Sequence, residues 1–138
     1  MNRPSKKEYY LNIADAVSKR GTCLRRNYGA VIVNNDEIVG TGYTGSPRGV
    51  DNCCDIGLCE RQRLNCKPGE RYELCKSVHA EQNAIISASR NRCIGATIYV
   101  SGREVKKQVL VNGHPCLLCS RMIVNAGIIE VICSKASD

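Results

Sequence analysis

Short apolar stretches, each about the length of one secondary-structure element, recur along the chain. Ser5 and Glu8 form a capping-box pattern, and apolar residues then recur at helical spacing, so we predict a first helix that ends near Gly21. Two β-branched runs follow at 30–33 and 38–43, and the four residues between them are polar turn formers. They predict a β-hairpin.

The second half of the chain alternates predicted helices and strands. Residues 44–76 are rich in glycine, proline and cysteine, which indicates a long irregular loop. The elements expected after it are a helix over 78–90, a strand over 96–100, a charged β-hairpin excursion over 102–113, a helix over 116–126 and a strand over 128–133. This order predicts an α/β domain with helices packed on a mixed sheet and an antiparallel pair at one end.

The composition narrows the class of protein. With 138 residues the chain is long enough for one domain, spanning 1–138, and too short for two. No apolar run approaches the roughly 20 residues of a membrane span, and the charged start lacks the apolar core of a signal peptide. We therefore expect a cytoplasmic protein without a membrane partner. In a reducing cytosol, the 10 cysteines favour metal ligands and buried thiols over disulfides.

The net charge of +7 suits an anionic ligand, either a phosphate monoester or a nucleic acid, although a solvated basic surface has the same charge. Aromatic residues are scarce, with 6 tyrosines and no phenylalanine or tryptophan. Proteins that bind single strands stack the bases on aromatic rings. The composition therefore favours a small-molecule nucleotide over a nucleic acid as the partner.

Two short motifs carry candidate chemistry, and each opens a predicted helix. Cys116 and Cys119 are three residues apart, so both thiols lie on one helical face. With a neutral His79 they supply three ligands that suit tetrahedral zinc with a fourth position open to water. Glu81 lies two residues past His79, near these ligands, and is free to act as an acid and base.

Each motif alone is a weak indicator. A Cys-x-x-Cys pair arises by chance about once in a chain so rich in cysteine, and it also fits a redox pair. His79 alone fits a surface or core histidine, and Glu81 alone fits a solvated helix residue. Together, H-x-E on one helix and P-C-x-x-C at the start of the next resemble the signature of zinc-dependent nucleobase deaminases.

The chain resembles the deoxycytidylate deaminase family of the cytidine deaminase-like superfamily. The similar segments cover most of the chain and include 26–33 (RNYGAVIV), 42–49 (GYTGSPRG), 79–85 (HAEQNAI) and 115–119 (PCLLC). The resemblance implies a three-layer α/β/α sandwich with a mixed sheet. It also implies one zinc held by His79, Cys116 and Cys119, and proton shuttling by Glu81. The implied reaction is the hydrolytic deamination of dCMP to dUMP and ammonia.

The resemblance also suggests residues that contact the substrate. Thr44 and its loop would face the sugar, and Arg90, nine residues past Glu81, would hold the 5′-phosphate. Arg26 is a weaker phosphate candidate. The family usually has asparagine where this chain has Thr44, and a hydroxyl reaches less far than an amide. Arg90 fits equally well as a cation that compensates the dipole at the end of its helix.

The remaining cysteines suggest a second, structural zinc. Cys23 follows the first helix, Cys53 and Cys59 lie in the 44–76 loop, and Cys75 comes just before the H-x-E motif. A closed four-thiolate site would tie these segments together and stabilise a loop with little apolar content. Members of the family bind a second zinc. Cys54 could replace Cys53, and four unlinked thiols are the alternative.

Longer relatives continue past the last strand and close the nucleotide site. We therefore expect another subunit of a homo-oligomer to supply that wall, unless the chain itself continues. Other functions remain open: a deaminase acting on cytidine, guanine or adenosine in tRNA, or a catalytically silent zinc module that binds nucleic acid. Cytidine deaminases usually carry cysteine in place of His79, and a structural zinc has no use for Glu81.

Overall fold

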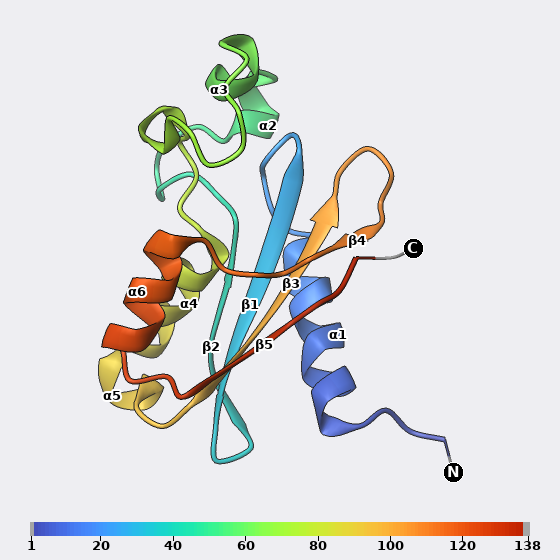
Figure 1. Ribbon diagram of the computed structural model, residues 1–138, viewed down its shortest axis with the longest axis vertical. Helices are drawn as coiled ribbons and strands as arrows, with labels where there is room; N and C mark the ends of the chain where they lie inside the picture. The colour runs from blue at the N-terminus through green and yellow to red at the C-terminus, as the bar shows by residue number, and fades with distance from the viewer. Residues whose placement is uncertain (1, 137–138) are drawn as a thin grey trace.

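A computed structural model describes residues 2–136 and places five strands in one mixed sheet with helices on both faces (Figure 1). The strands are Arg26–Asn34 (β1), Glu37–Tyr43 (β2), Thr97–Glu104 (β3), Leu110–Val111 (β4) and Glu130–Cys133 (β5). The helices are Lys6–Ser18 (α1), Cys53–Ile56 (α2), Glu60–Arg63 (α3), Ala80–Ala88 (α4), Arg90–Cys93 (α5) and Leu117–Asn125 (α6), with a 3-10 turn at Tyr72–Leu74 (η1). Within the described residues, no helix combines the length and apolarity needed to cross a membrane.

The first helix and the hairpin form as the sequence predicted. The backbone N–H of Glu8 donates to Ser5 Oγ at 3.2 Å, which caps the start of α1. β1 and β2 pair antiparallel, and the turn residues Asn35 and Asp36 both have positive φ, at 52° and 59°. A type I′ hairpin turn requires this geometry, and asparagine and aspartate adopt it with little strain.

The sheet is antiparallel along one edge and mixed along the other. β1 lies between β2 and β3 and is antiparallel to both. The outer edge of β3 is shared by two strands: β5 runs parallel to residues 97–100, and β4 pairs antiparallel with residues 102–103. The charged excursion after β3 is therefore a short hairpin, as the sequence predicted.

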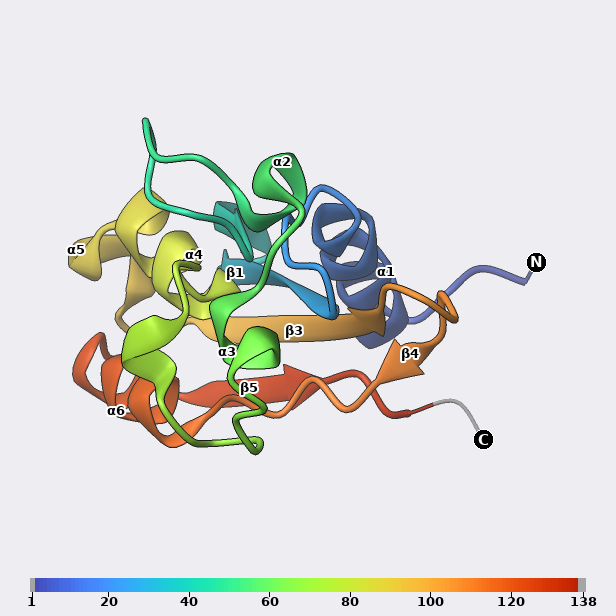
Figure 2. The same ribbon diagram turned by 90° about the horizontal axis from the view of Figure 1, so that it is seen from above.

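Alternating residues of the central strand face two different helical layers. Val31 and Val33 pack with α1 on one face, while Ala30 and Ile32 pack with α4 and α6 on the other. Figure 2 shows α1 and the α4–α6 group on opposite sides of the strands. The protein is therefore the three-layer α/β/α sandwich that the sequence predicted.

Glycines let the helices sit unusually close to the sheet. A Cβ atom at Gly29 of β1 would lie 2.1 Å from the carbonyl oxygen of Ala14 in α1. A Cβ atom at Gly42 of β2 would lie 2.4 Å from the carbonyl oxygen of Ala80, the first residue of α4. The close contact at Gly42 fixes the start of α4 against the sheet, and this start carries the H-x-E motif.

Two segments differ from the sequence prediction. The helix predicted over 78–90 is shorter, because Ser89 has a φ of 71° that ends α4 at Ala88 and separates it from α5. The 44–76 segment is also less irregular than predicted. It contains α2, α3 and η1, which lie beyond one end of the sheet (Figure 1).

Candidate active site

The candidate zinc ligands lie at the starts of two helices that share one face of the sheet. His79 is the N-cap residue of α4, and its backbone N–H donates to Gln82 Oε1 at 3.0 Å. Cys116 is the N-cap residue of α6, and its Sγ accepts the backbone N–H of Cys119 at 3.4 Å. Local capping therefore holds both motifs at helix starts, where the positive end of the helix dipole stabilises thiolates.

The fold brings the three predicted ligands together. His79 Nδ1 lies 3.2 Å from Cys119 Sγ and 3.5 Å from Cys116 Sγ. The ligand atoms of His79, Cys116 and Cys119 all lie within 4.8 Å of one another. Two sulfurs and one imidazole nitrogen at this spacing fit a zinc ion with three protein ligands and one open position.

Glu81 lies beside this group and is almost entirely buried, with 5% of its surface exposed. Burial raises the pKa of the Glu81 carboxyl above its ordinary value. Burial also raises the pKa of the Cys119 thiol, and the neighbouring Glu81 raises it further. A buried carboxyl with a raised pKa is suited to accept and return a proton near neutral pH.

A cavity of about 680 Å³ opens onto the site. His79, Glu81 and Cys116 form part of its wall, and two further predicted residues, Arg26 and Thr44, line it as well. Thr44 follows β2 and is 8% exposed, and its hydroxyl oxygen accepts the backbone N–H of Tyr28 at 3.0 Å. The Thr44 hydroxyl also donates to the carbonyl oxygen of Tyr28 at 3.5 Å, so both of its bonds go to the backbone of β1.

Arg90 is not in the wall of this cavity, so the placement does not support its predicted role in holding a phosphate. It begins α5, is exposed, and its Nε donates to the carbonyl oxygen of Asn125 at 3.5 Å. Asn125 is the last residue of α6, whereas the ligands lie at the start. α4 continues from Glu81 to Ala88, a rise of about 10 Å, before the break at Ser89, so Arg90 in α5 lies at the far end of α4 from Glu81.

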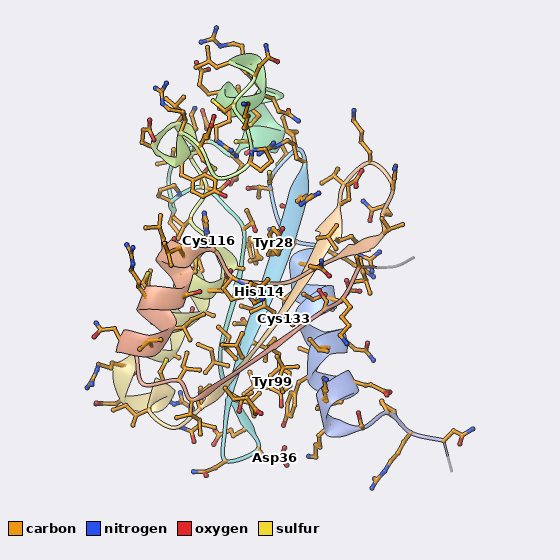
Figure 3. All side chains as sticks on the ribbon, in the orientation of Figure 1. Tyr28, Asp36, Tyr99, His114, Cys116 and Cys133 are labelled. Atoms are coloured by element: carbon orange, nitrogen blue, oxygen red, sulfur yellow. The ribbon has the colours of Figure 1, made fainter. Side chains whose placement is uncertain are left out.

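Several residues of the wall carried no recognisable pattern in the sequence. These are Arg25, Arg61, Tyr72, Ser77, Lys106 and His114. Figure 3 labels three side chains of the wall: Tyr28 on β1, Cys116 at the start of α6, and His114 in the segment before it. Only His114 could have been predicted as a cavity residue, because it directly precedes the P-C-x-x-C motif. The other residues reach the cavity through long-range folding.

The segment between α2 and α4 covers the site on one side. Tyr72 packs edge-on against the His79 ring, with the ring centroids 5.9 Å apart and the planes at 82°. Arg61 is 4% exposed, and its guanidinium lies over the Tyr72 ring. This segment therefore contacts a candidate zinc ligand directly.

The four cysteines of the predicted structural site line one small cavity of about 30 Å³ next to the larger one. Burial raises the pKa of the Cys53 thiol, and the nearby thiols of Cys23, Cys59 and Cys75 raise it further. Within residues 2–136, only the group of His79, Cys116 and Cys119 has three or more ligand atoms all within 4.8 Å of one another. The four thiols are thus neighbours, but they are more widely spaced than zinc ligands.

Three clustered ligands, an adjacent buried carboxyl and a cavity on an α/β/α sandwich together define a zinc-dependent enzyme. The chain belongs to the family described as "Cytidine and deoxycytidylate deaminase zinc-binding region", which matches residues 4–135.

Relatives of known name agree with this assignment. The chain is 38% identical over 142 residues to the deoxycytidylate deaminase of Mycobacterium phage D29, covering 99% of this chain and 100% of the relative. It is 35% identical over 130 residues to the deoxycytidylate deaminase of Schizosaccharomyces pombe, covering 94% of this chain but 37% of the relative. The chain therefore matches the phage protein along its whole length and the yeast protein over little more than a third.

Solved structures have the same fold. The dCMP deaminase from the cyanophage S-TIM5, in complex with dCMP and dUMP, superposes with a TM-score of 0.65 at 27% identity. The match covers 95% of this chain and 82% of the phage chain.

Proposed function

We propose that this protein catalyses the hydrolytic deamination of dCMP to dUMP and ammonia. The observation that carries the proposal is the gathering of His79, Cys116 and Cys119 within 4.8 Å of one another, beside the buried Glu81. The cavity that opens onto this group has arginines in its wall, as an anionic nucleotide requires. The names of the phage and yeast relatives support dCMP as the substrate.

His79, Cys116 and Cys119 would hold the catalytic zinc. When bound, zinc supplies a water molecule acidified enough to be a nucleophile near neutral pH. Two thiolates already neutralise the charge of the metal, so its water is less acidic than at a three-histidine site. A base on the protein is correspondingly more important here.

Glu81 would be that base and then an acid. Its carboxylate takes the proton of the attacking water and transfers it to N3 of the pyrimidine ring. It then helps to protonate the amine that leaves C4, so one side chain moves each proton without a net change in its own charge. The burial of Glu81 supports this role, because the raised pKa makes the protonated form accessible during turnover.

Thr44 and Arg26 are the predicted substrate contacts that line the cavity. The Thr44 hydroxyl would exchange its long bond to the Tyr28 carbonyl oxygen, 3.5 Å, for a bond to a sugar oxygen, while it still accepts the N–H of Tyr28. Arg26 is exposed at the start of β1 and would contribute positive charge at the opening.

The four neighbouring thiols of Cys23, Cys53, Cys59 and Cys75 support a second, structural zinc. A zinc ion holds thiolates at about 2.3 Å, so binding would require these side chains to rotate toward one another. All four side chains line one small cavity of about 30 Å³. This zinc would stabilise the 53–76 segment, which packs against His79 through Tyr72.

A homo-oligomer is supported by apolar side chains exposed on α6 and around β5. Leu117, Val124 and Ile129 are 68%, 75% and 77% exposed. Apolar patches of this kind on a folded chain commonly mark a protein interface, and we propose a second copy as the partner. A cytoplasmic location is supported by the cysteines, which are all free thiols.

The decisive experiment compares ammonia release from dCMP, dCTP, deoxycytidine, guanine and a tRNA anticodon stem. We expect the highest kcat/KM with dCMP. A higher kcat/KM with another substrate would assign the enzyme to that substrate. Zinc-loaded protein that releases ammonia from none of them would identify a silent zinc module.

A further inference from the structure

Tyr28 is the aromatic residue that the central strand β1 contributes to the wall of the large cavity (Figure 3). Residues two apart on a strand face the same side of the sheet, so Tyr28 shares the face of Ala30, which packs with α4 and α6. Its side chain is half-buried and packs partly against this core. The remainder of the ring forms part of the cavity floor.

The backbone of Tyr28 is fixed beside Thr44, and Thr44 is close to the zinc site. The N–H of Tyr28 donates to Thr44 Oγ1 at 3.0 Å, and the carbonyl oxygen of Tyr28 accepts the N–H of Thr44 at 3.1 Å. Gly45 exchanges two backbone hydrogen bonds with Val78, at 2.7 and 3.2 Å, and Val78 directly precedes His79. Two steps between neighbouring extended segments span about 10 Å, which separates Tyr28 from the segment that enters the zinc site.

This separation determines which part of a cytosine nucleotide reaches Tyr28. The carbon that reacts, C4, must lie beside the zinc ligands. The sugar is attached to N1, on the opposite side of the pyrimidine ring. A ring held with C4 at His79 and its sugar at Thr44, the proposed sugar contact, therefore places that sugar next to Tyr28.

The ring of Tyr28 is supported from below and cannot retreat from a bulkier sugar. A Cβ atom at Gly102 of β3 would lie 2.5 Å from Cε1 of Tyr28 and 2.8 Å from Cγ2 of Val111, so the ring lies directly on the glycine backbone. Ser134, which is 7% exposed, fixes that backbone. Its Oγ accepts the N–H of Gly102 at 3.1 Å and donates to the carbonyl oxygen of Val111 at 2.8 Å. A wall packed in this way discriminates between ligands by their size.

We infer that Tyr28 is a specificity-determining residue whose ring lies against C2′ of the sugar and selects deoxyribose over ribose. A 2′-hydroxyl pressed against the ring would lose its hydrogen bonds to water and gain none in return. An apolar surface rejects one added hydroxyl by about 100-fold. The inference rests on the proposed function, because it requires a cytosine nucleotide with C4 at the zinc. The competing explanation is a purely structural role, since Tyr28 also packs against the core.

The first test uses wild-type protein and ligands that cannot be deaminated. Calorimetry compares the binding of dUMP, UMP and 2′-O-methyl-UMP, which differ only in the group on C2′. We expect the affinity to fall as this group grows, by about 100-fold from dUMP to UMP. UMP or 2′-O-methyl-UMP bound as tightly as dUMP would overturn the inference, whether or not any variant folds.

The second test assigns the selectivity to the ring. Tyr28→Phe keeps the ring, and Tyr28→Val removes it. Tyr43→Val is the matched control, because Tyr43 directly precedes Thr44 but lies outside the cavity wall. We expect Tyr28→Val to reduce the ratio of kcat/KM for dCMP to that for CMP by at least about 10-fold. Tyr28→Phe and Tyr43→Val should keep the wild-type ratio.

The outcomes separate the possible roles of Tyr28. Equal loss of activity on dCMP and CMP in Tyr28→Val, with an unchanged ratio, would assign Tyr28 a structural role and overturn the inference. Loss of the preference in Tyr28→Phe would overturn it as well, because the hydroxyl and not the ring would then select the sugar. Failure of the proposed function would look different: neither dCMP nor CMP would release ammonia, while calorimetry would still measure the preference for dUMP over UMP.

Discussion

The guanidinium carbon of Arg61 lies 4.8 Å from the centroid of the Tyr72 ring. Arg61 also donates from Nε to the carbonyl oxygen of Glu70 at 3.0 Å and from its NH2 group to that of Lys67 at 2.9 Å. One buried side chain therefore binds two backbone oxygens and an aromatic ring of the same segment. Tyr72 in turn packs against His79. Arg61 therefore holds the part of the 53–76 segment that contacts a candidate zinc ligand.

Arg61→Gln should loosen the 53–76 segment. Removing the guanidinium leaves two carbonyl oxygens and the Tyr72 ring without their partner, which should cost about 1–3 kcal/mol. Hydrogen exchange should show faster exchange confined to this segment, and the KM for the substrate should rise. The control is Arg63→Gln, which removes an exposed arginine that pairs with Glu60, three residues before it. If both variants exchange at the wild-type rate, Arg61 does not hold the segment.

Glu81→Gln should separate metal binding from turnover. The amide has the shape of the carboxyl but cannot accept a proton, so kcat should fall by about 10²–10⁴-fold or more. The three proposed zinc ligands are untouched, so the catalytic zinc measured by atomic absorption should remain bound. Turnover within a few-fold of wild type would rule out Glu81 as the proton carrier.

The small cavity lined by Cys23, Cys53, Cys59 and Cys75 leads to a prediction of how many zinc ions each chain binds. Wild-type protein that has never been exposed to chelator should contain two zinc ions per chain, and Cys59→Ser should contain one. Loss of a structural metal is among the largest effects of a single substitution, so the free energy of unfolding should fall by more than about 4 kcal/mol. Cys54→Ser provides the control, since Cys54 is exposed and lies outside the cavity. One zinc per wild-type chain would exclude the second site.

Protonation of Asp36 should lower the free energy of unfolding at acidic pH. Its hydrogen bond with Lys6, and then that with Tyr10, lowers the pKa of the carboxyl below its usual 3.8. A lowered pKa stabilises the fold above the unfolded value, and this contribution disappears as the pH falls through the folded value. Urea unfolding should therefore show a constant difference between wild type and Asp36→Asn at pH 6–8, shrinking below about pH 4. Asparagine keeps the positive φ of the turn, so a difference that persists at low pH would point to the hydrogen bonds and not the charge.

Deprotonation of Tyr10, which donates to Asp36, should lower the free energy of unfolding at alkaline pH. The hydrogen bond from the Tyr10 hydroxyl to Asp36, 2.6 Å long, raises the pKa of Tyr10 from 10.0 to about 12. A raised pKa stabilises the fold below the unfolded value, and the contribution is lost as the pH rises from 10 to 12. Tyr10→Phe should therefore flatten the alkaline part of the stability profile.

Local signals in the sequence determined the element types and the ligand motifs. The Ser5 cap, the β-branched runs of the hairpin and the H-x-E and P-C-x-x-C motifs each act within a few residues, and the structure places them as predicted. The fold class followed from the order of these elements, because short connections leave few ways to pack helices on a sheet. The break at Ser89 went undetected, since serine is common inside helices and nothing nearby in the sequence marks a positive φ.

The tertiary structure alone decided which basic side chains reach the cavity. Arginines are spread along the whole sequence. The residues next to an arginine in the chain do not reveal whether its side chain lines the cavity or points into solvent. The family resemblance suggested Arg90 as a phosphate contact, but Arg90 lies in α5, beyond the break at Ser89, and is not in the wall of the cavity. Arg25 and Ser77 lie 52 residues apart (77 − 25) and meet at one cavity only because β1 and the start of α4 pack together. The sequence could therefore identify the residues suited to the chemistry, while the packing of distant segments determined which of them line the cavity.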